Sequence, residues 1–233
     1  MLIKFVGVVF KATPKGEFDK ILKIVTPDGQ VTATIKGVKR PNAKLKHGAV
    51  PFAFCFFEAA KKQDFLTITN AVTALDLSDI SADYQKLVAG SIALEAAAYA
   101  IKPNSGQDHF VNLLKALKSI IFCKNCDKDP YIGAIVFLQN LIHSGGYFYD
   151  YQRYQKIENP LQLLSYLHFN GWAEGEKEEV FEIKPQEKDE TGKNQDLMQS
   201  VSRSLIIKTL LKIVLSFENK FDCKINSALS LSF

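Results

Sequence analysis

The chain has 233 residues, of which 47% are apolar, and a net charge of +4, so it can bury the core of one or two globular domains. No stretch reaches the roughly 18 apolar residues that a membrane span needs, and the opening MLIKFVGVVFK lacks a signal-peptide cleavage site. Four scattered cysteines argue against a disulfide scaffold and agree with a reducing compartment. We therefore expect a cytoplasmic protein that does not contact the membrane.

Positive charge is concentrated in the N-terminal third of the chain. Residues 1–75 carry twelve Lys and Arg against five Asp and Glu, a balance of +7, whereas residues 76–233 have a balance of −3. A basic surface attracts polyanions, and nucleic acid is the commonest polyanion in cytoplasm. The alternative is a solvated basic face that only aids solubility.

Five β-rich runs occupy the same third of the chain. Several alternate apolar with polar residues, as half-buried strands do, and they span 2–11, 19–27, 30–39, 51–59 and 65–72. The PDGQ sequence at 27–30 predicts a tight hairpin, because Pro presets φ and Asp-Gly tolerates positive φ. Short strands this close together predict a small antiparallel barrel, since closure removes exposed sheet edges.

The stretch IKGVKRPNAKLKHG, residues 35–48, falls between the third and fourth predicted strands. It has five basic side chains and no acid, and its Gly37 and Pro41 are incompatible with a helix. Lys11 and Lys15, which we place in the first turn, extend the basic track. The predicted nucleic-acid contacts are Lys11, Lys15, Lys36, Lys39, Arg40, Lys44 and Lys46.

Aromatic residues in the run PFAFCFFEA offer either a stacking platform for bases or a core. Strand alternation favours the core for Phe52, Phe54 and Phe56. For Phe18, in the first turn, the pattern leaves burial and exposure open.

Helical patterns begin after Leu77. The first starts behind a candidate N-cap at Ser81 and stops at Pro103. The acidic, polar stretch 173–196 is typical of an exposed loop. The predicted helices span 81–102, 109–122, 132–146, 159–172 and 197–219. We therefore predict an α+β protein with a β-barrel domain at 1–78 and an all-α helical-bundle domain at 79–233.

Three segments of the N-terminal third carry a family resemblance: GVVFKATPKGEFDKILKIVTPDGQ, IKGVKRPNAKLKHGAVPF and FLTITNAV. They resemble, in order and spacing, the N-terminal domain of the RecO family of recombination mediators. That family shows a strand, a "YGE-D" turn, a hairpin, "KGARRPKSRL" and "LQPF". The closing LLKIVLSFENKFDCKINSALSLSF resembles the family's last helix, and HSGGYFYDY stands where the family has an "LGY" turn. The resemblance implies an OB-fold barrel followed by a helical domain.

The same resemblance implies a function in DNA repair and recombination. Members of the family bind single- and double-stranded DNA, anneal complementary strands and help load RecA on strands coated with single-strand-binding protein. The implied protein partners are RecR, through the OB fold, and the acidic C-terminal tail of single-strand-binding protein, with RecA engaged indirectly. A generic OB-fold binder of single-stranded DNA or RNA, with a helical half that is structural or dimerising, is the alternative.

The tail of single-strand-binding protein requires an apolar pocket beside a cation for its terminal carboxylate. The cations that we select for this role are Arg153, Lys156 and Arg203, near the apolar Tyr147, Leu161 and Leu205. The alternative for these residues is ordinary surface charge.

Metal and catalytic motifs are weak or missing in the sequence. Cys123-x-x-Cys126 is half of a tetrahedral zinc site, but no second pair follows the "LGY" position where the family's zinc ribbon stands. We therefore expect a turn without metal, no zinc ribbon and no cofactor. The chain has no GxxxxGK[ST], GxSxG or HExxH, so we expect a binding protein and not an enzyme.

Overall fold

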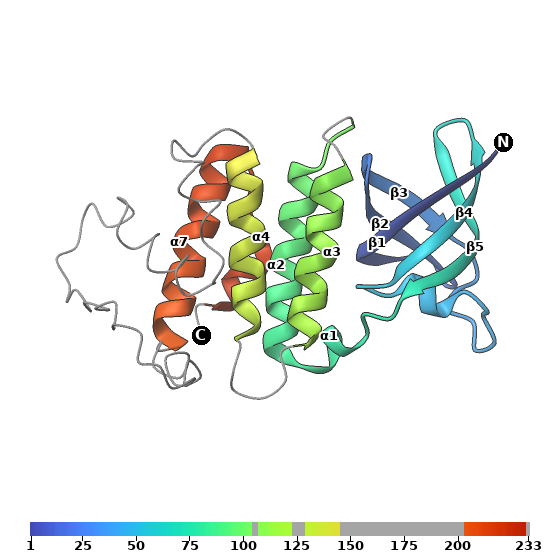
Figure 1. The fold of residues 1–233 in the computed structure, drawn as a ribbon. Helices are drawn as coiled ribbons and strands as arrows, with labels where there is room; N and C mark the ends of the chain where they lie inside the picture. The colour runs from blue at the N-terminus through green and yellow to red at the C-terminus, as the bar shows by residue number, and fades with distance from the viewer. Residues whose placement is uncertain (104–106, 123–128, 145–202, 232–233) are drawn as a thin grey trace, which may run out of the picture.

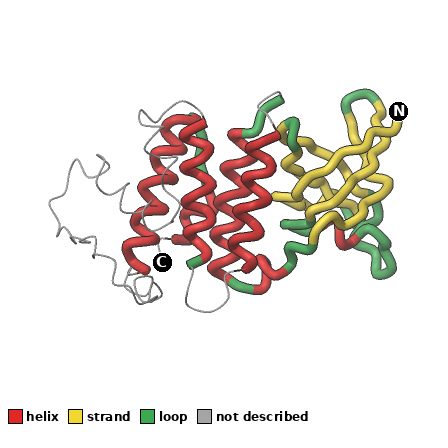
Figure 2. The backbone as a smooth tube through the Cα atoms, viewed as in Figure 1, coloured by secondary structure: helices red, strands yellow, loops and turns green. Residues whose placement is uncertain are grey.

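The computed structural model describes residues 1–103, 107–122, 129–144 and 203–231, as a β-barrel followed by helices (Figures 1 and 2). The strands are β1 Leu2–Lys15, β2 Asp19–Thr26, β3 Gly29–Ile35, β4 Phe54–Lys62 and β5 Phe65–Leu75, with a 3-10 turn η1 at Lys46–Ala49. The helices are α1 Asp79–Ala82, α2 Tyr84–Ala100, α3 Gln107–Phe122, α4 Pro130–Ser144 and α7 Arg203–Phe221, followed by the 3-10 helix η3 at Asn226–Leu231. This arrangement is consistent with an OB fold plus a helical region. The domain boundary after residue 78 stays a prediction.

The barrel closes in the order β1-β2-β3-β5-β4. Four of its strand pairs are antiparallel, but β3 pairs with β5 in parallel, with Thr34 opposite Thr67 and Ile35 opposite Ile68. The prediction of a fully antiparallel barrel is therefore wrong at this pair. Five strands in a closed ring cannot all alternate in direction, so an odd-numbered barrel must contain a parallel pair.

The ends of β1 and β3 differ from the prediction. β1 continues to Lys15, so Lys11 and Lys15 belong to this strand and not to the first turn. β3 ends at Ile35, four residues earlier than expected, because Gly37 has a φ of +64° and its amide turns away toward the β1–β2 turn. The predicted hairpin is present, with Gly29 at a φ of +111°. The basic stretch therefore starts directly at the barrel rim.

The prediction that Phe56 packs in the core is wrong, because this residue of β4 points to the outer face of the barrel. Phe57 lies inside the barrel, 1% exposed and stacked on Phe5 with ring centroids 5.5 Å apart. Phe56 points outward between Val6 and Val72 and is 59% exposed. β4 begins only at Phe54, and Cys55 and Phe57 then take the inward positions of the alternating pattern.

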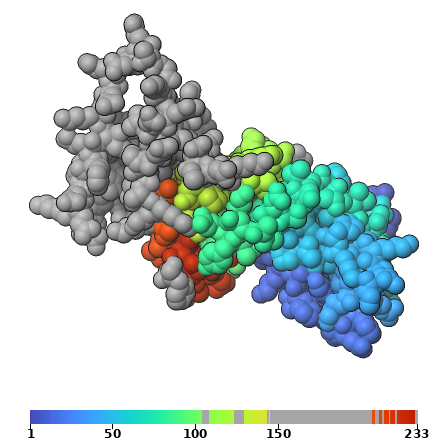
Figure 3. Space-filling view, turned by 90° about the horizontal axis from the view of Figure 1, so that it is seen from below, coloured from blue at the N-terminus to red at the C-terminus, as the bar shows by residue number. Residues whose placement is uncertain are grey.

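Phe52 and Phe54 are packed as expected, but against the helices and not inside the barrel. Phe52 is buried and Phe54 half-buried, and both contact the core cluster of α2, α3, α4 and α7. The ring centroids of Phe54 and of Phe110 on α3 are 6.1 Å apart. One apolar cluster therefore joins barrel and helices, apart from the barrel's own inner core, and the two parts lie against each other in the space-filling view (Figure 3).

Helix α2 begins about one turn later than the sequence predicts, whereas α3 and α4 each begin two residues earlier than predicted. Ser81 lies inside the short α1, and the N-cap of α2 is Asp83, whose carboxylate accepts from the amides of Gln85 and Lys86 at 2.8 and 3.0 Å. The predicted helix at 159–172 and the loop at 173–196 lie outside the described residues. No helix in the described part of the chain is long and apolar enough to cross a membrane.

A glycine on α2 makes room for Phe52. Phe52 has a φ of +64°, unusual for a bulky residue, and its amide donates to the carbonyl of Val9 at 2.8 Å. A Cβ atom on Gly90 would lie 2.9 Å from the Phe52 ring and 2.9 Å from Ile80 Cγ2. The absence of a side chain at position 90 therefore allows this ring to insert between barrel and helix.

We predict that Gly90→Val lowers the free energy of unfolding by about 1–3 kcal/mol, the usual cost of overpacking a filled core. Thermal or urea denaturation of the full chain measures this loss. In the double variant Phe52→Ala/Gly90→Val the valine occupies the space that the ring leaves. The double variant should therefore lose less free energy of unfolding than the sum of the losses in the two single variants. If the losses in free energy of unfolding add up exactly, the side chains at positions 52 and 90 do not compete for the same space.

Candidate nucleic-acid interface

The basic loop between β3 and β4 is folded onto the turn between β1 and β2. The amide of Lys39 donates to the carbonyl of Phe18 at 2.9 Å, and the Lys39 ammonium reaches the carbonyl of Gly16 at 3.1 Å. Two further backbone bonds, from Arg40 to Gly37 and from Ala43 to Arg40, close turns within the loop. The loop is held by its backbone and by the ammonium groups of Lys39 and Lys46, the latter on the Pro41 carbonyl, which leaves Lys36 and Lys44 at the surface.

Asp19 fixes the start of this loop. Its Oδ1 accepts a hydrogen bond from the Gly37 amide at 2.8 Å, joining the first residue of β2 to the residues that follow β3. Gly16 and Gly37 both have positive φ, near +60°, where a residue with a side chain would be strained. Each glycine therefore has a conformational reason to stand at its turn.

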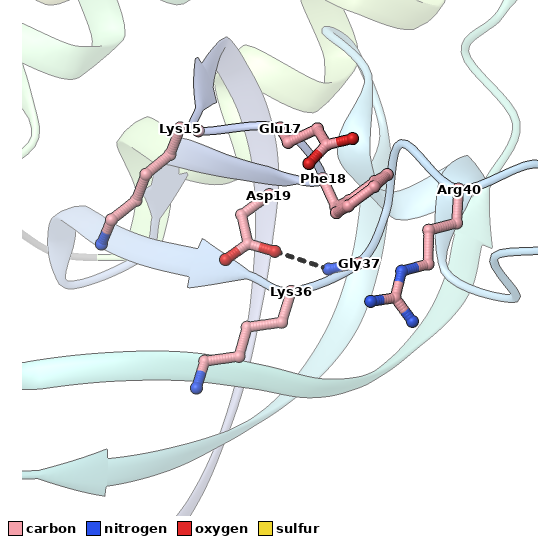
Figure 4. A pocket seen from close by; sticks show the side chains of 8 residues that line it. Lys15, Glu17, Phe18, Asp19, Lys36, Gly37 and Arg40 are labelled. Carbon is pink, nitrogen blue, oxygen red and sulfur yellow. Dashed lines mark hydrogen bonds between the residues drawn. The ribbon is translucent and has the colours of Figure 1, made fainter.

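A pocket of about 430 Å³ lies between the turn and the loop (Figure 4). Lys15 and Lys36 reach toward one side of it, with Asp19 between them, and the Arg40 guanidinium lies 4.9 Å from the centre of the Phe18 ring. The full lining is Lys15, Gly16, Glu17, Phe18, Asp19, Lys36, Gly37 and Arg40. Three predicted contacts, from two different segments, thus share one pocket.

A second hollow of about 300 Å³ lies on the other side of the loop. Its cations are Lys39, Lys46 and Lys20, with Val38 and Val50 completing the lining. Lys20, whose ammonium donates to the Ala49 carbonyl at 2.9 Å, is not among the residues predicted from the sequence. Nothing in the strand pattern distinguished Lys20, because only the folded loop brings residue 49 beside β2.

Two lysines stand opposite each other on the outer face of the barrel. Lys11 on β1 is the partner of Lys23 on β2, and both are exposed. Like charges directly opposite across strands destabilise a sheet, so this pair has a cost that a bound polyanion would remove. Lys23 was also missed, although its alternation with Leu22 and Ile24 could have placed it on the outer face.

An ion pair lies on the barrel surface where β1 pairs with β4. Lys4 on β1 donates to Glu58 on β4 at 2.9 Å. This hydrogen bond and the opposite charge raise the pKa of Lys4 and lower the pKa of Glu58. By contrast, Lys11 and Lys23 on β1 and β2, and Lys36 and Lys44 in the basic loop, make no ion pair in the described part of the structure.

The remaining predicted residues are placed as follows. Lys44 is exposed in the loop. Arg203 is the first residue of α7, but its side chain lies outside the described part of the structure. Arg153, Lys156, Cys123 and Cys126 lie outside the described residues as well. Among the residues that are described, no group of His, Cys, Asp or Glu is arranged to hold a metal ion.

The barrel and its basic rim define an OB-type domain with a surface suited to a polyanion. Residues 1–75 match the family model "Recombination protein O N terminal", which confirms the resemblance to the RecO family for this part of the chain. The match covers the barrel and ends before the helices. No curated protein matches the chain.

We predict that Asp19→Ala loosens the basic loop, because the Gly37 amide loses its acceptor. The loss of a hydrogen bond to a charged group, about 1.5 kcal/mol, should speed tryptic cleavage after Lys36 about tenfold. Mass spectrometry of timed digests measures the rate at this site and, as an internal reference, after Lys61 and Lys62. Asp19→Asn keeps an acceptor oxygen and should cleave close to the wild-type rate; equal acceleration in both variants would contradict this account.

Proposed function

We propose that this protein is a DNA-binding recombination mediator in DNA repair, and that it binds DNA through the basic loop and the outer face of β1 and β2. The observation that carries the proposal is the uncompensated cluster of lysine and arginine at one rim of a barrel that matches the RecO N-terminal family. The family match suggests a recombination-mediator role, and the charge supplies the attraction to phosphates.

The proposed contacts neutralise phosphates and do not read bases. The cations lie on a loop and on strands, and no described helix presents a basic face beside them for a major groove. We therefore propose binding to single- and double-stranded DNA without sequence specificity. Each phosphate contact releases counterions, so the affinity should fall steeply with salt.

The later steps of the proposed role are annealing of complementary strands and help in loading RecA on strands coated with single-strand-binding protein. We propose RecR and the C-terminal tail of single-strand-binding protein as partners, with RecA engaged indirectly and with no catalytic turnover. The cytoplasm, at the nucleoid, is the proposed location. Support for these steps comes from the family match, since the cations chosen for the tail lie outside the described side chains.

The first prediction concerns two lysines of the loop. Lys36 and Lys44 are both exposed, so their removal should leave the loop folded. In Lys36→Ala/Lys44→Ala, affinity for a fluorescent single strand should fall several-fold to tenfold, and the slope of log affinity against log salt should flatten by about 1 to 1.5. Fluorescence anisotropy across a salt series measures both quantities.

The matched control is Lys115→Ala/Lys118→Ala, which removes the same charge from the exposed side of α3. This control should keep the wild-type salt slope. If both double variants change the slope equally, net charge and not the loop governs binding. If neither changes it, the basic loop is only solvated and the DNA site must be sought elsewhere in the chain.

The second prediction separates a mediator from a passive binder. A mediator should accelerate pairing of complementary strands already coated with single-strand-binding protein, whereas a protein that only coats strands should slow it. The reaction can be followed by fluorescence, since energy transfer between dyes on the two complementary strands rises as they pair. The variant Lys36→Ala/Lys44→Ala should lose most of the acceleration at the same protein concentration. Inhibition by the wild type would favour the generic single-strand binder.

A further inference from the structure

We propose that the pocket between the β1–β2 turn and the basic loop binds one unpaired nucleotide, with its base stacked on the Phe18–Arg40 pair and its phosphate held by Lys15 and Lys36. This inference rests on the proposed DNA-binding function and adds a preference for single strands at this site. It also assigns a role to Phe18, whose exposure the sequence pattern left open.

Phe18 is the aromatic element of the pocket. Its residue is 38% exposed at the tip of a turn and belongs to neither core cluster of the described structure. The Arg40 guanidinium lies 4.9 Å from the ring centroid, which forms a layered pair of a flat cation and an aromatic ring. Bases stack on aromatic rings and on guanidinium planes alike, so an unpaired base can extend this pair.

The backbone holds the ring in place beside the loop. The Phe18 carbonyl accepts from the Lys39 amide at 2.9 Å, and Asp19, the next residue, accepts from the Gly37 amide at 2.8 Å. These two bonds fix Phe18 and the residue that follows it to the segment that carries Arg40. The stacking surface is therefore ordered before the ligand arrives, which reduces the entropy lost on binding.

The charges of the pocket suit a nucleotide better than a bare phosphate. Three cations, Lys15, Lys36 and Arg40, face two carboxylates, Glu17 and Asp19, so the formal balance is only +1. Lys15 and Lys36 extend to one side, away from the Phe18 ring (Figure 4). A phosphate fits beside the two lysines, and a carboxylate oxygen can accept from the exocyclic amine of a base.

Size and geometry favour an unpaired nucleotide over a duplex. A volume of about 430 Å³ lies within the range of small-ligand pockets and is too small for a base pair with its two backbones. In a duplex the faces of the bases are covered by their neighbours, so a ring can stack only on an end or on an unpaired base. The outer face with Lys11 and Lys23 remains available to both forms of DNA.

The affinity test compares Phe18→Ala with Phe56→Ala. Phe56 is also exposed, at 59% against 38% for Phe18, but it lies on β4, which is not a neighbour of β2 or β3 in the barrel. Phe18→Ala should weaken binding of an oligo-dT single strand about tenfold, leave duplex affinity unchanged, and keep the wild-type salt slope. Phe56→Ala should change none of these, and Phe18→Tyr should retain most of the affinity for the single strand.

A direct readout of stacking comes from Phe18→Trp combined with Trp172→Phe, which moves the chain's single tryptophan to the pocket. Its fluorescence should be quenched by the oligo-dT strand, while a covalently closed duplex circle, which has no ends, and inorganic phosphate should leave it unchanged. Quenching by the duplex to the same extent, or wild-type single-strand affinity in Phe18→Ala, would overturn the nucleotide pocket.

The failure of this inference differs from the failure of the proposed function. If the wild-type protein binds DNA with a salt slope that depends on Lys36 and Lys44, but Phe18→Ala binds normally and the tryptophan is not quenched, only the pocket is wrong. If the wild-type protein binds no DNA at all, the proposed function fails and the pocket fails with it.

Discussion

The insertion of the Phe52 ring beside Gly90 is the contact on which the joining of barrel and helices depends. Phe52 adopts a positive φ, a strain that costs about 1–3 kcal/mol, and burial of a phenylalanine ring recovers about 1.5–3 kcal/mol. The strained segment is also where the chain leaves the basic loop and enters β4. The geometry of the loop is therefore limited at one end by a core contact and at the other by the bond between Asp19 and Gly37.

Between these two fixed ends, some basic side chains of the loop hold its turns, whereas others are exposed to solvent. Lys39 and Lys46 donate to backbone carbonyls, of Gly16 and Pro41, and so help to hold the turns. Lys36 and Lys44 extend into solvent, and Arg40 pairs with an aromatic ring. A stretch that looks uniform in sequence thus contains residues of three kinds, and only the folded loop distinguishes them. Substitutions of the whole stretch would mix loss of binding with loss of loop structure.

Much of the barrel could be predicted from the sequence because local patterns decide it. Strand alternation, the Asp-Gly hairpin and the acid-free basic stretch all depend on neighbouring residues. The inward position of Phe57, by contrast, depends on where β4 begins, and the parallel pairing of β3 with β5 depends on ring closure. Lys20 and the Phe18–Arg40 pair join the site only through contacts between residues far apart in the chain. Such contacts leave no periodic signal in one sequence.

On the outer surface of the barrel, Lys11 of β1 and Lys23 of β2 face each other, whereas Lys4 of β1 forms an ion pair with Glu58 of β4, so positive charge is in excess where β1 meets β2. Such a separation of charge orients the domain in the field of a polyanion before any contact forms. A DNA strand would then meet the loop side of the barrel more often than random collisions allow. The surface around the Lys4–Glu58 ion pair, where Phe56 is exposed on β4, would be turned away from the strand and left accessible to other molecules.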